Sequence, residues 1–111
     1  MASRRKEHQE DAKFRIFQII NENPKMTTRQ MAQKVGISNG SAYYLLISLI
    51  DMGFVKLSNF KDSSQKIKYS YLLTPKGIRE KSLVTGKFLK RKKQEYELLK
   101  KEISELERDL S

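Results

Sequence analysis

The spacing of helix-capping residues and glycine between residues 27 and 53 constrains the possible folds of this chain more than any other feature. Thr27 precedes Gln30 at the spacing of a capping box, in which each side chain bonds the other residue's free backbone N–H. Gly36 follows where a left-handed residue ends a helix, and Ser38 is placed to cap a new helix that ends at Gly53. The sequence therefore predicts two helices joined by a turn of about three residues, the order of a helix-turn-helix motif.

Apolar residues at helical spacing give three helices one buried face each. The first helix is expected over residues 8–22 and ends at Asn23-Pro24, because a residue before proline is pushed out of the helical region. The second begins at Thr27, and the third runs from about residue 39 to 52. The expected core residues of the three helices are Phe14, Ile16, Phe17, Ile19, Ile20, Met31, Ala32, Val35, Ala42, Leu45, Leu46 and Leu49, with Ile37 from the turn.

Two segments with strand-like alternation follow the third helix, at residues 55–60 and 66–73. The polar loop Lys61–Gln65 between them has no glycine or proline, which predicts a mobile tip rather than a tight turn. Thr74-Pro75 then starts a helix with a cap followed by proline at the first helical position. The predicted fold class is mainly α with a small β-hairpin wing (α+β), a winged helix-turn-helix over residues 8–74 preceded by a disordered basic arm over residues 1–7.

The C-terminal segment, residues 75–111, is expected to be one long helix with a bend near Thr85-Gly86. Apolar residues recur at 3–4 spacing along its last third, interrupted by Lys92, and most other positions are charged, which is the pattern of a coiled-coil seam. The seam residues are Leu89, Tyr96, Leu99, Ile103, Leu106 and Leu110. The pattern favours a homodimer over a helix that folds back on its own domain. Because about three heptads is short for a coiled coil, the first helix or residues 78–89 are expected to contribute to the dimer as well.

Charge and composition narrow the classes of partner. The net charge is +10, and residues 27–85 hold nine Lys and Arg against three acidic residues, an excess that attracts polyanions. The chain has no cysteine, which excludes disulfides and thiolate metal sites and suits a cytoplasmic protein. We expect no membrane association, because no apolar stretch reaches the roughly 18 residues of a spanning helix and no secretory signal is visible.

Catalytic chemistry has little support in the sequence. His8 is the only histidine and lies in a polar terminal stretch, so no Ser/His/Asp set can be assembled without it. The acidic residues of the central part show no pairing typical of a metal site or an acid–base dyad. We therefore expect a protein that is not an enzyme and needs no metal or cofactor. The sequence does not identify a small-molecule effector.

The helix-turn-helix predicts binding to double-stranded DNA, with the third helix in the major groove. The residues expected to face the groove are Asn39, Ser41, Tyr43, Tyr44 and Ser48. Thr28 and Arg29, where the second helix begins, are expected at phosphates, and Lys61, Lys66 and Lys68 of the hairpin at phosphates or in the minor groove. Alternative roles are helix capping for Thr28 and Arg29, protection of a strand edge for the lysines, and packing for one of the two tyrosines, above all Tyr43. The fold also occurs in modules that bind only protein, which is the alternative function.

Several stretches carry a family resemblance. They are Thr28-Arg29-Gln30-Met31-Ala32, Val35-Gly36-Ile37-Ser38, Tyr44-Leu45-Leu46, Leu49-Ile50, Gly53-Phe54-Val55-Lys56, Tyr71-Leu72-Leu73-Thr74-Pro75-Lys76-Gly77 and Phe88-Leu89-Lys90-Arg91-Lys92. With them, residues 10–105 resemble the MarR-like winged-helix regulators, above all the short bacterial ones associated with exopolysaccharide clusters. The resemblance implies a bacterial, cytoplasmic, homodimeric transcription regulator of polysaccharide genes.

One departure from that family concerns the third helix, where such proteins often carry Lys or Arg on the outer face. Residues 38–52 contain neither, and Asp51 is their only charged residue. The commonest specific contact, arginine to guanine, is therefore not available from this helix. Base preference would depend on Asn39, Ser41 and Tyr44 or on DNA shape. Ile47, on the outer face, either touches a thymine methyl or marks a protein-facing surface.

Overall fold

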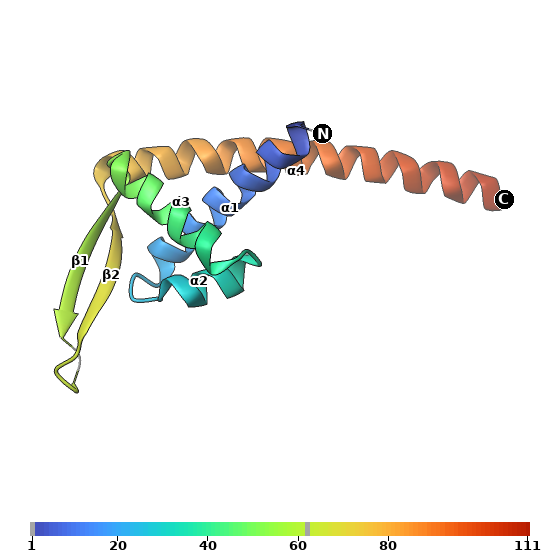
Figure 1. Ribbon diagram of the computed structural model, residues 1–111. Helices are drawn as coiled ribbons and strands as arrows, with labels where there is room; N and C mark the ends of the chain where they lie inside the picture. Colours follow the sequence, from blue (N-terminus) through green and yellow to red (C-terminus); the bar gives the residue numbers. More distant parts are fainter. Residues whose placement is uncertain (1, 62) are drawn as a thin grey trace.

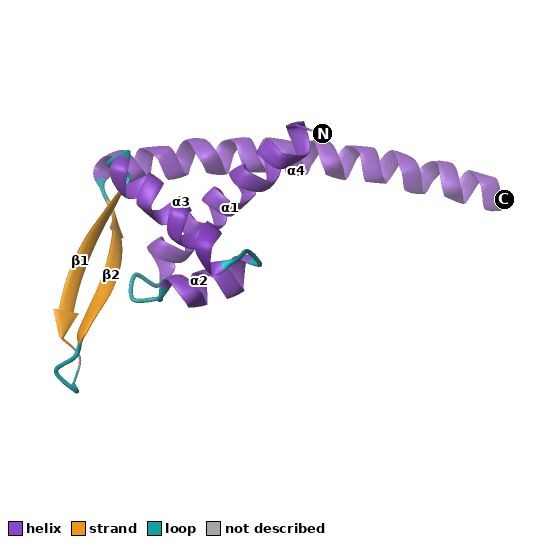
Figure 2. Cartoon of the chain, in the orientation of Figure 1, coloured by secondary structure: helices purple, strands orange, loops and turns teal. Residues whose placement is uncertain are grey.

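The computed structural model describes the backbone of residues 2–61 and 63–111 and the side chains of residues 6–61 and 63–111. Within those residues the order of elements is α1 (Ala2–Glu22), α2 (Thr28–Val35), α3 (Asn39–Asp51), β1 (Val55–Lys61), β2 (Ile67–Leu73) and α4 (Pro75–Leu110). The strands pair as an antiparallel hairpin, and α4 projects far beyond the other elements (Figures 1 and 2). The predicted fold class, helical with a β-hairpin wing, is confirmed.

The helix caps form as the sequence predicts. The backbone N–H of Gln30 donates to the Thr27 hydroxyl at 3.1 Å, and the backbone N–H of Thr27 donates to the Gln30 side chain at 2.9 Å, which completes the capping box. Gly36 ends α2 with a φ of 84°, in the left-handed region. The Ser38 hydroxyl accepts from the backbone N–H of Ser41 at 3.1 Å and so caps α3. These bonds satisfy backbone groups that a helix end leaves open.

The core lies where α1 crosses α2, α3 and the base of the hairpin. Its fully buried side chains with the largest volumes are Phe17, Ile16, Met31, Leu46 and Leu49, and all of them come from the predicted stripes. Phe54, Val55 and Val84 complete the cluster from the segments that follow α3. Burying apolar side chains of this size contributes about 1.5–3 kcal/mol each. The core therefore holds α1, the helix-turn-helix and the start of α4 as one body.

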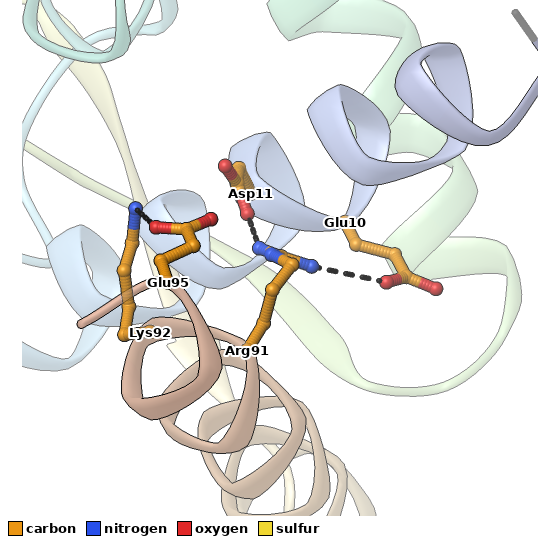
Figure 3. Close-up of polar contacts among 5 residues, drawn as sticks. All are labelled: Glu10, Asp11, Arg91, Lys92 and Glu95. Atoms are coloured by element: carbon orange, nitrogen blue, oxygen red, sulfur yellow. Dashed lines mark hydrogen bonds and ion pairs between the residues drawn. The ribbon is translucent and has the colours of Figure 1, made fainter. Parts of the chain in front are cut away.

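The expectation of a disordered arm over residues 1–7 is wrong for residues 2–7, which belong to α1, while Met1 lies outside the described residues. Contacts between α1 and α4 explain why these residues are helical. Arg91 forms ion pairs with Asp11 and, at 3.5 Å, with Glu10 (Figure 3). Phe14 stacks on Phe88 with ring centroids 4.3 Å apart. Because these contacts hold α1 from Glu10 onward, earlier residues extend an existing helix and need no new nucleus.

The first half of α4 packs against α1 and the second half does not. Val84 is buried and Arg91 is half-buried, whereas residues 92–111 are exposed. The helix runs without interruption through Thr85-Gly86, where the sequence predicts a bend. The Thr85 hydroxyl donates to the carbonyl of Lys81 at 2.7 Å, a bond that stays inside the helix. The structure therefore leaves a long helical arm outside the domain.

Contacts at the junction between the hairpin and α4 explain why the residues from Thr74 to Gly77 are of these types. The Thr74 hydroxyl donates to the Gly53 carbonyl at 2.5 Å and accepts from the Gly77 N–H at 3.0 Å. The Lys76 ammonium donates to the carbonyl of Met52 at 2.9 Å, at the end of α3. A Cβ on Gly77 would lie 1.9 Å from the backbone carbonyl oxygen of Phe54. Only glycine lets the two backbones approach this closely.

Replacing Gly77 by alanine should reduce the free energy of unfolding by about 1–3 kcal/mol, because the added methyl group must displace backbone atoms. The matched control is Gly86→Ala, whose Cβ would meet nothing within 4 Å. Alanine is the better helix former there, so the control should gain up to about 1 kcal/mol. Urea unfolding followed by circular dichroism, at one protein concentration, measures both variants. Equal stabilities would contradict the close approach at Gly77.

Candidate nucleic-acid interface

The outer face of α3 carries large uncharged side chains. Tyr44 is 80% exposed, Tyr43 59% and Ile47 39%, while Ala42, Leu46 and Leu49 on the opposite face are buried. Of the two roles considered for Tyr43, packing and DNA contact, its exposed side chain favours DNA contact. Asn39, also exposed, is the first residue of the helix. From Asn39 to Ile47, α3 therefore presents an amide, two phenols and an aliphatic side chain to solvent.

The two serines predicted to face DNA lie on one flank of α3. Ser41 and Ser48 line an open groove of about 690 Å³ between α3 and the N-terminal half of α1, together with Tyr44 and Leu45. Ile37, expected in the core, is half-buried and lines the same groove. The hydroxyl of Ser41 accepts from the Ser38 hydroxyl at 2.9 Å. The predicted groove-facing residues thus divide between the outer face and this flank.

The hairpin carries the predicted lysines on both of its faces. Lys61 lies opposite Ile67 and Lys68 opposite Phe60 in the strand register, so Lys61 and Lys68 point to different faces. Lys66 precedes β2 in the tip, and all three side chains are exposed. Toward its tip the hairpin also exposes Tyr69 and Ile67, while Tyr71 and Leu73 pack against the core. The lysines therefore surround a tip that projects away from the core.

The N-terminus of α2 holds one of its two predicted phosphate ligands in an internal contact. The Thr28 hydroxyl is hydrogen-bonded to the hydroxyl of Tyr71 at 3.1 Å. Arg29 is exposed beside it. The capping role falls to Thr27, as described above, so the Thr28 side chain joins α2 to the hairpin. Its backbone N–H group, in the first turn of the helix, is the part of Thr28 suited to an anion.

Three contacts attach the hairpin to the segment between α1 and α2 and to the first residue of α2, and the sequence pattern did not predict them. The N–H of Tyr71 donates to the carbonyl of Pro24 at 2.9 Å, on the free edge of β2. The second contact is the Tyr71–Thr28 pair. The third is the Lys25 ammonium, 4.8 Å from the centre of the Phe60 ring. Nothing in the sequence around Lys25 signals this contact, because its partner lies on another element.

Among the described residues, no group of three or more His, Cys, Asp or Glu side chains is placed to hold a metal ion. Within the same part of the chain, no helix combines the length and apolar character needed to cross a membrane.

Comparison with known proteins supports the arrangement seen here. Residues 9–56 match the family model described as winged helix-turn-helix DNA-binding. A PadR-like transcriptional regulator from Bacillus cereus superposes with a TM-score of 0.69 at 18% identity, over 78% of this chain and 89% of that one. No curated protein sequence matches the chain.

Two structures from Staphylococcus aureus are also similar. MarR in complex with salicylate and kanamycin gives a TM-score of 0.55 at 20% identity, over 74% of this chain and 53% of that one. A variant of MepR gives a TM-score of 0.60 at 14% identity, over 100% of this chain and 94% of that one. The chain thus spans about half of the MarR chain and nearly all of the PadR-like and MepR chains.

The chain has the winged helix-turn-helix fold. The resemblance to MarR-like regulators is confirmed at the level of the fold. In the winged helix, α3 is the recognition helix and the β1–β2 hairpin is the wing. The wing and α2 both lie on the side of the domain away from α4 (Figure 1).

Charge is distributed unevenly over this winged helix. The recognition helix has no cation and one acidic residue, Asp51 in its last turn. Exposed cations occur on the elements beside it, with Arg29 and Lys34 on α2 and Lys56, Lys61 and Lys68 on the wing. A surface of this kind can attract phosphates at its edges while a helix without cations enters a groove.

Replacing Tyr71 by phenylalanine should cost about 0.5–1.5 kcal/mol of unfolding free energy, because it removes the hydroxyl that pairs with Thr28 in a half-buried position. Tyr69→Phe is the matched control, since Tyr69 is 55% exposed on the same strand. Chemical denaturation of both variants at one protein concentration gives the difference. If the two variants lose the same stability, the hydroxyl pair does not help hold the wing to α2.

Proposed function

We propose that this protein is a transcription regulator that binds double-stranded DNA as a homodimer. The observation that carries the proposal is an exposed recognition helix without cations, flanked in the sequence by exposed cations of α2 and of the wing. The recognition helix enters the major groove with its N-terminal residues at base edges. The proposed base-facing residues are Asn39, Ser41, Tyr43, Tyr44 and Ser48.

Phosphate contacts are assigned to the elements beside the recognition helix. They are the first turn of α2, through the Thr28 backbone and the Arg29 side chain, and the wing lysines Lys61, Lys66 and Lys68. Helix N-termini and lysine side chains both suit phosphate oxygens. Because the regulator would act by occupying its site, it needs no catalytic group. In a bacterium, which the sequence resemblance implies, a DNA-binding regulator works in the cytoplasm.

Salt dependence tests the DNA-binding proposal directly. A protein that makes about six phosphate contacts should lose on the order of 10³ in affinity between 50 and 200 mM salt, because binding releases condensed counterions. Fluorescence anisotropy with a labelled duplex measures the affinity across this range. Absence of duplex binding at 50 mM salt would overturn the proposal and favour the alternative, a winged-helix module that binds only protein.

The wing assignment predicts the effect of replacing Lys66 and Lys68 together by alanine. Binding to all duplex sequences should weaken alike, and the slope of log affinity against log salt should become shallower by about one to two units, because up to two phosphate contacts are lost. The matched control removes two exposed lysines of α4, Lys90→Ala plus Lys101→Ala, and should leave the slope unchanged. A change in sequence preference, with an unaltered slope, would contradict the assignment.

Homodimerisation is proposed from the exposed arm of α4. Leu99 is 56% exposed, Leu106 59% and Leu110 90% in the single chain. The predicted seam, Leu89, Tyr96, Leu99, Ile103, Leu106 and Leu110, therefore lies along one uncovered side of a rigid helix. Two copies that pair along this seam would bury it. Their recognition helices would then reach half-sites about 34–36 Å apart, one turn of DNA.

Leu99→Lys plus Leu106→Lys should raise the dimer dissociation constant by a hundredfold or more, since burying each leucine contributes about 1.5–3 kcal/mol. Sedimentation equilibrium measures the change. The control is Leu98→Lys, which introduces the same side chain one position away from the seam at a residue that is 69% exposed. A dimer that withstands the double substitution would place the interface on another surface.

The target genes are the least direct part of the proposal. A role at polysaccharide genes rests on the sequence resemblance alone. Selection of bound sequences from a random duplex library, followed by a search for those sequences upstream of genes, tests it. Sites that lie only upstream of genes of other kinds would remove the polysaccharide assignment and leave DNA binding intact.

A further inference from the structure

The side chains on the outer face of the recognition helix indicate which class of base pair this helix would contact in the major groove. Three of its exposed side chains, Tyr43, Tyr44 and Ile47, present mainly apolar surface, although the helix lies in a strongly basic protein. Such a face needs an apolar group on its ligand. Within the major groove, the C5-methyl group of thymine is the apolar feature of the base edges.

We propose that α3 recognises thymine methyl groups, so that each half-site carries T·A pairs where Tyr44 and Ile47 meet the groove. This inference rests on the proposed function, because it specifies the DNA sequence class that the same surface would select. Ile47 is the main specificity-determining residue. Its branched side chain has no polar atom and is 39% exposed in the absence of DNA.

The usual specific partners of the other base edges are missing from this face. Guanine presents two acceptors, which Arg or Lys contacts in the commonest specific interaction, and residues 38–52 contain neither. Cytosine presents a donor, for which a carboxylate is the usual acceptor, and Asp51 is the only carboxylate of α3. Asp51 lies in the last turn of α3, one turn beyond Ile47 and farthest from the end of the helix that enters the groove. The exposed amide of Asn39, in the first turn, suits the adenine of a T·A pair.

Charge complementarity supports DNA as the occupant of this apolar face. Arg29 on α2 and Lys61 and Lys68 on the wing are exposed on the elements beside α3. Phosphate strands on either side of a major groove would meet cations there. Two different interactions then act together, namely ionic contacts at the edges and apolar contacts at the centre. Salt weakens the first kind and leaves the second nearly unchanged.

Uracil substitution tests the inference without altering the pairing of the bases. In a duplex chosen by library selection, each thymine opposite α3 is replaced by uracil, which lacks only the methyl group. Affinity should fall about fourfold for each contacted methyl, the effect of exposing one buried carbon group. The loss should be the same at 50 and 200 mM salt. Thymines outside the sites of α3 contact serve as the internal control and should show no loss.

A substitution cycle assigns the effect to a residue. At the thymine that meets Ile47, Ile47→Ala should bind the uracil and thymine duplexes with nearly equal affinity, while Ile47→Val should keep most of the difference. Alanine favours helix, and Ile47 is not in the core, so the fold is retained. A selected site with guanine opposite α3, or wild-type binding that is indifferent to uracil at every position, would overturn the inference and leave DNA binding standing. Absence of duplex binding would overturn the proposed function itself.

Discussion

The close approach of Gly77 to the Phe54 carbonyl is the constraint on which the rest of the structure depends. At this point the end of α3, the first residues of β1, the end of β2 and the start of α4 meet. Thr74 adds a hydroxyl that bonds both Gly53 and Gly77. The junction therefore sets the direction of the wing and of the long arm relative to the recognition helix. A side chain at residue 77 would push these elements apart.

A second set of contacts holds the wing at its other side. Tyr71 reaches Pro24 with its backbone and Thr28 with its hydroxyl, and Lys25 covers Phe60. The wing is thus joined both to the end of the recognition helix and to the start of α2. This attachment matters for function, because the wing and α2 carry cations that the recognition helix lacks. Their spacing relative to α3 decides whether phosphates and bases can be contacted at once.

The contacts between α1 and the first half of α4 explain how α4 can pack on its own domain and also present a seam to a second copy. Val84, Phe88 and Arg91 of α4 face α1, with Arg91 bonded to Asp11 and Phe88 stacked on Phe14. The predicted seam lies about one residue further around the helix, so Leu89 is exposed although Phe88 is packed. The sequence left open whether α4 folds back on its own domain or pairs with a second copy. Its first half packs on α1, and the seam stays uncovered for the proposed dimer.

The sequence by itself determined the local elements and the core-facing residues. The capping box at Thr27, the left-handed Gly36 and the stripe of Ala42, Leu46 and Leu49 depend on neighbours within a few residues, so a pattern reveals them. Tertiary structure decided what depends on distant partners. Residues 2–7 extend a helix that is held by a contact between Arg91 and Asp11, 80 residues apart. Strand β2 has an alternating sequence, but it packs on the core only near Tyr71 and Leu73, because the wing projects past the core. Such contacts depend on the folded arrangement of the whole chain, because no local pattern records which distant surfaces will meet.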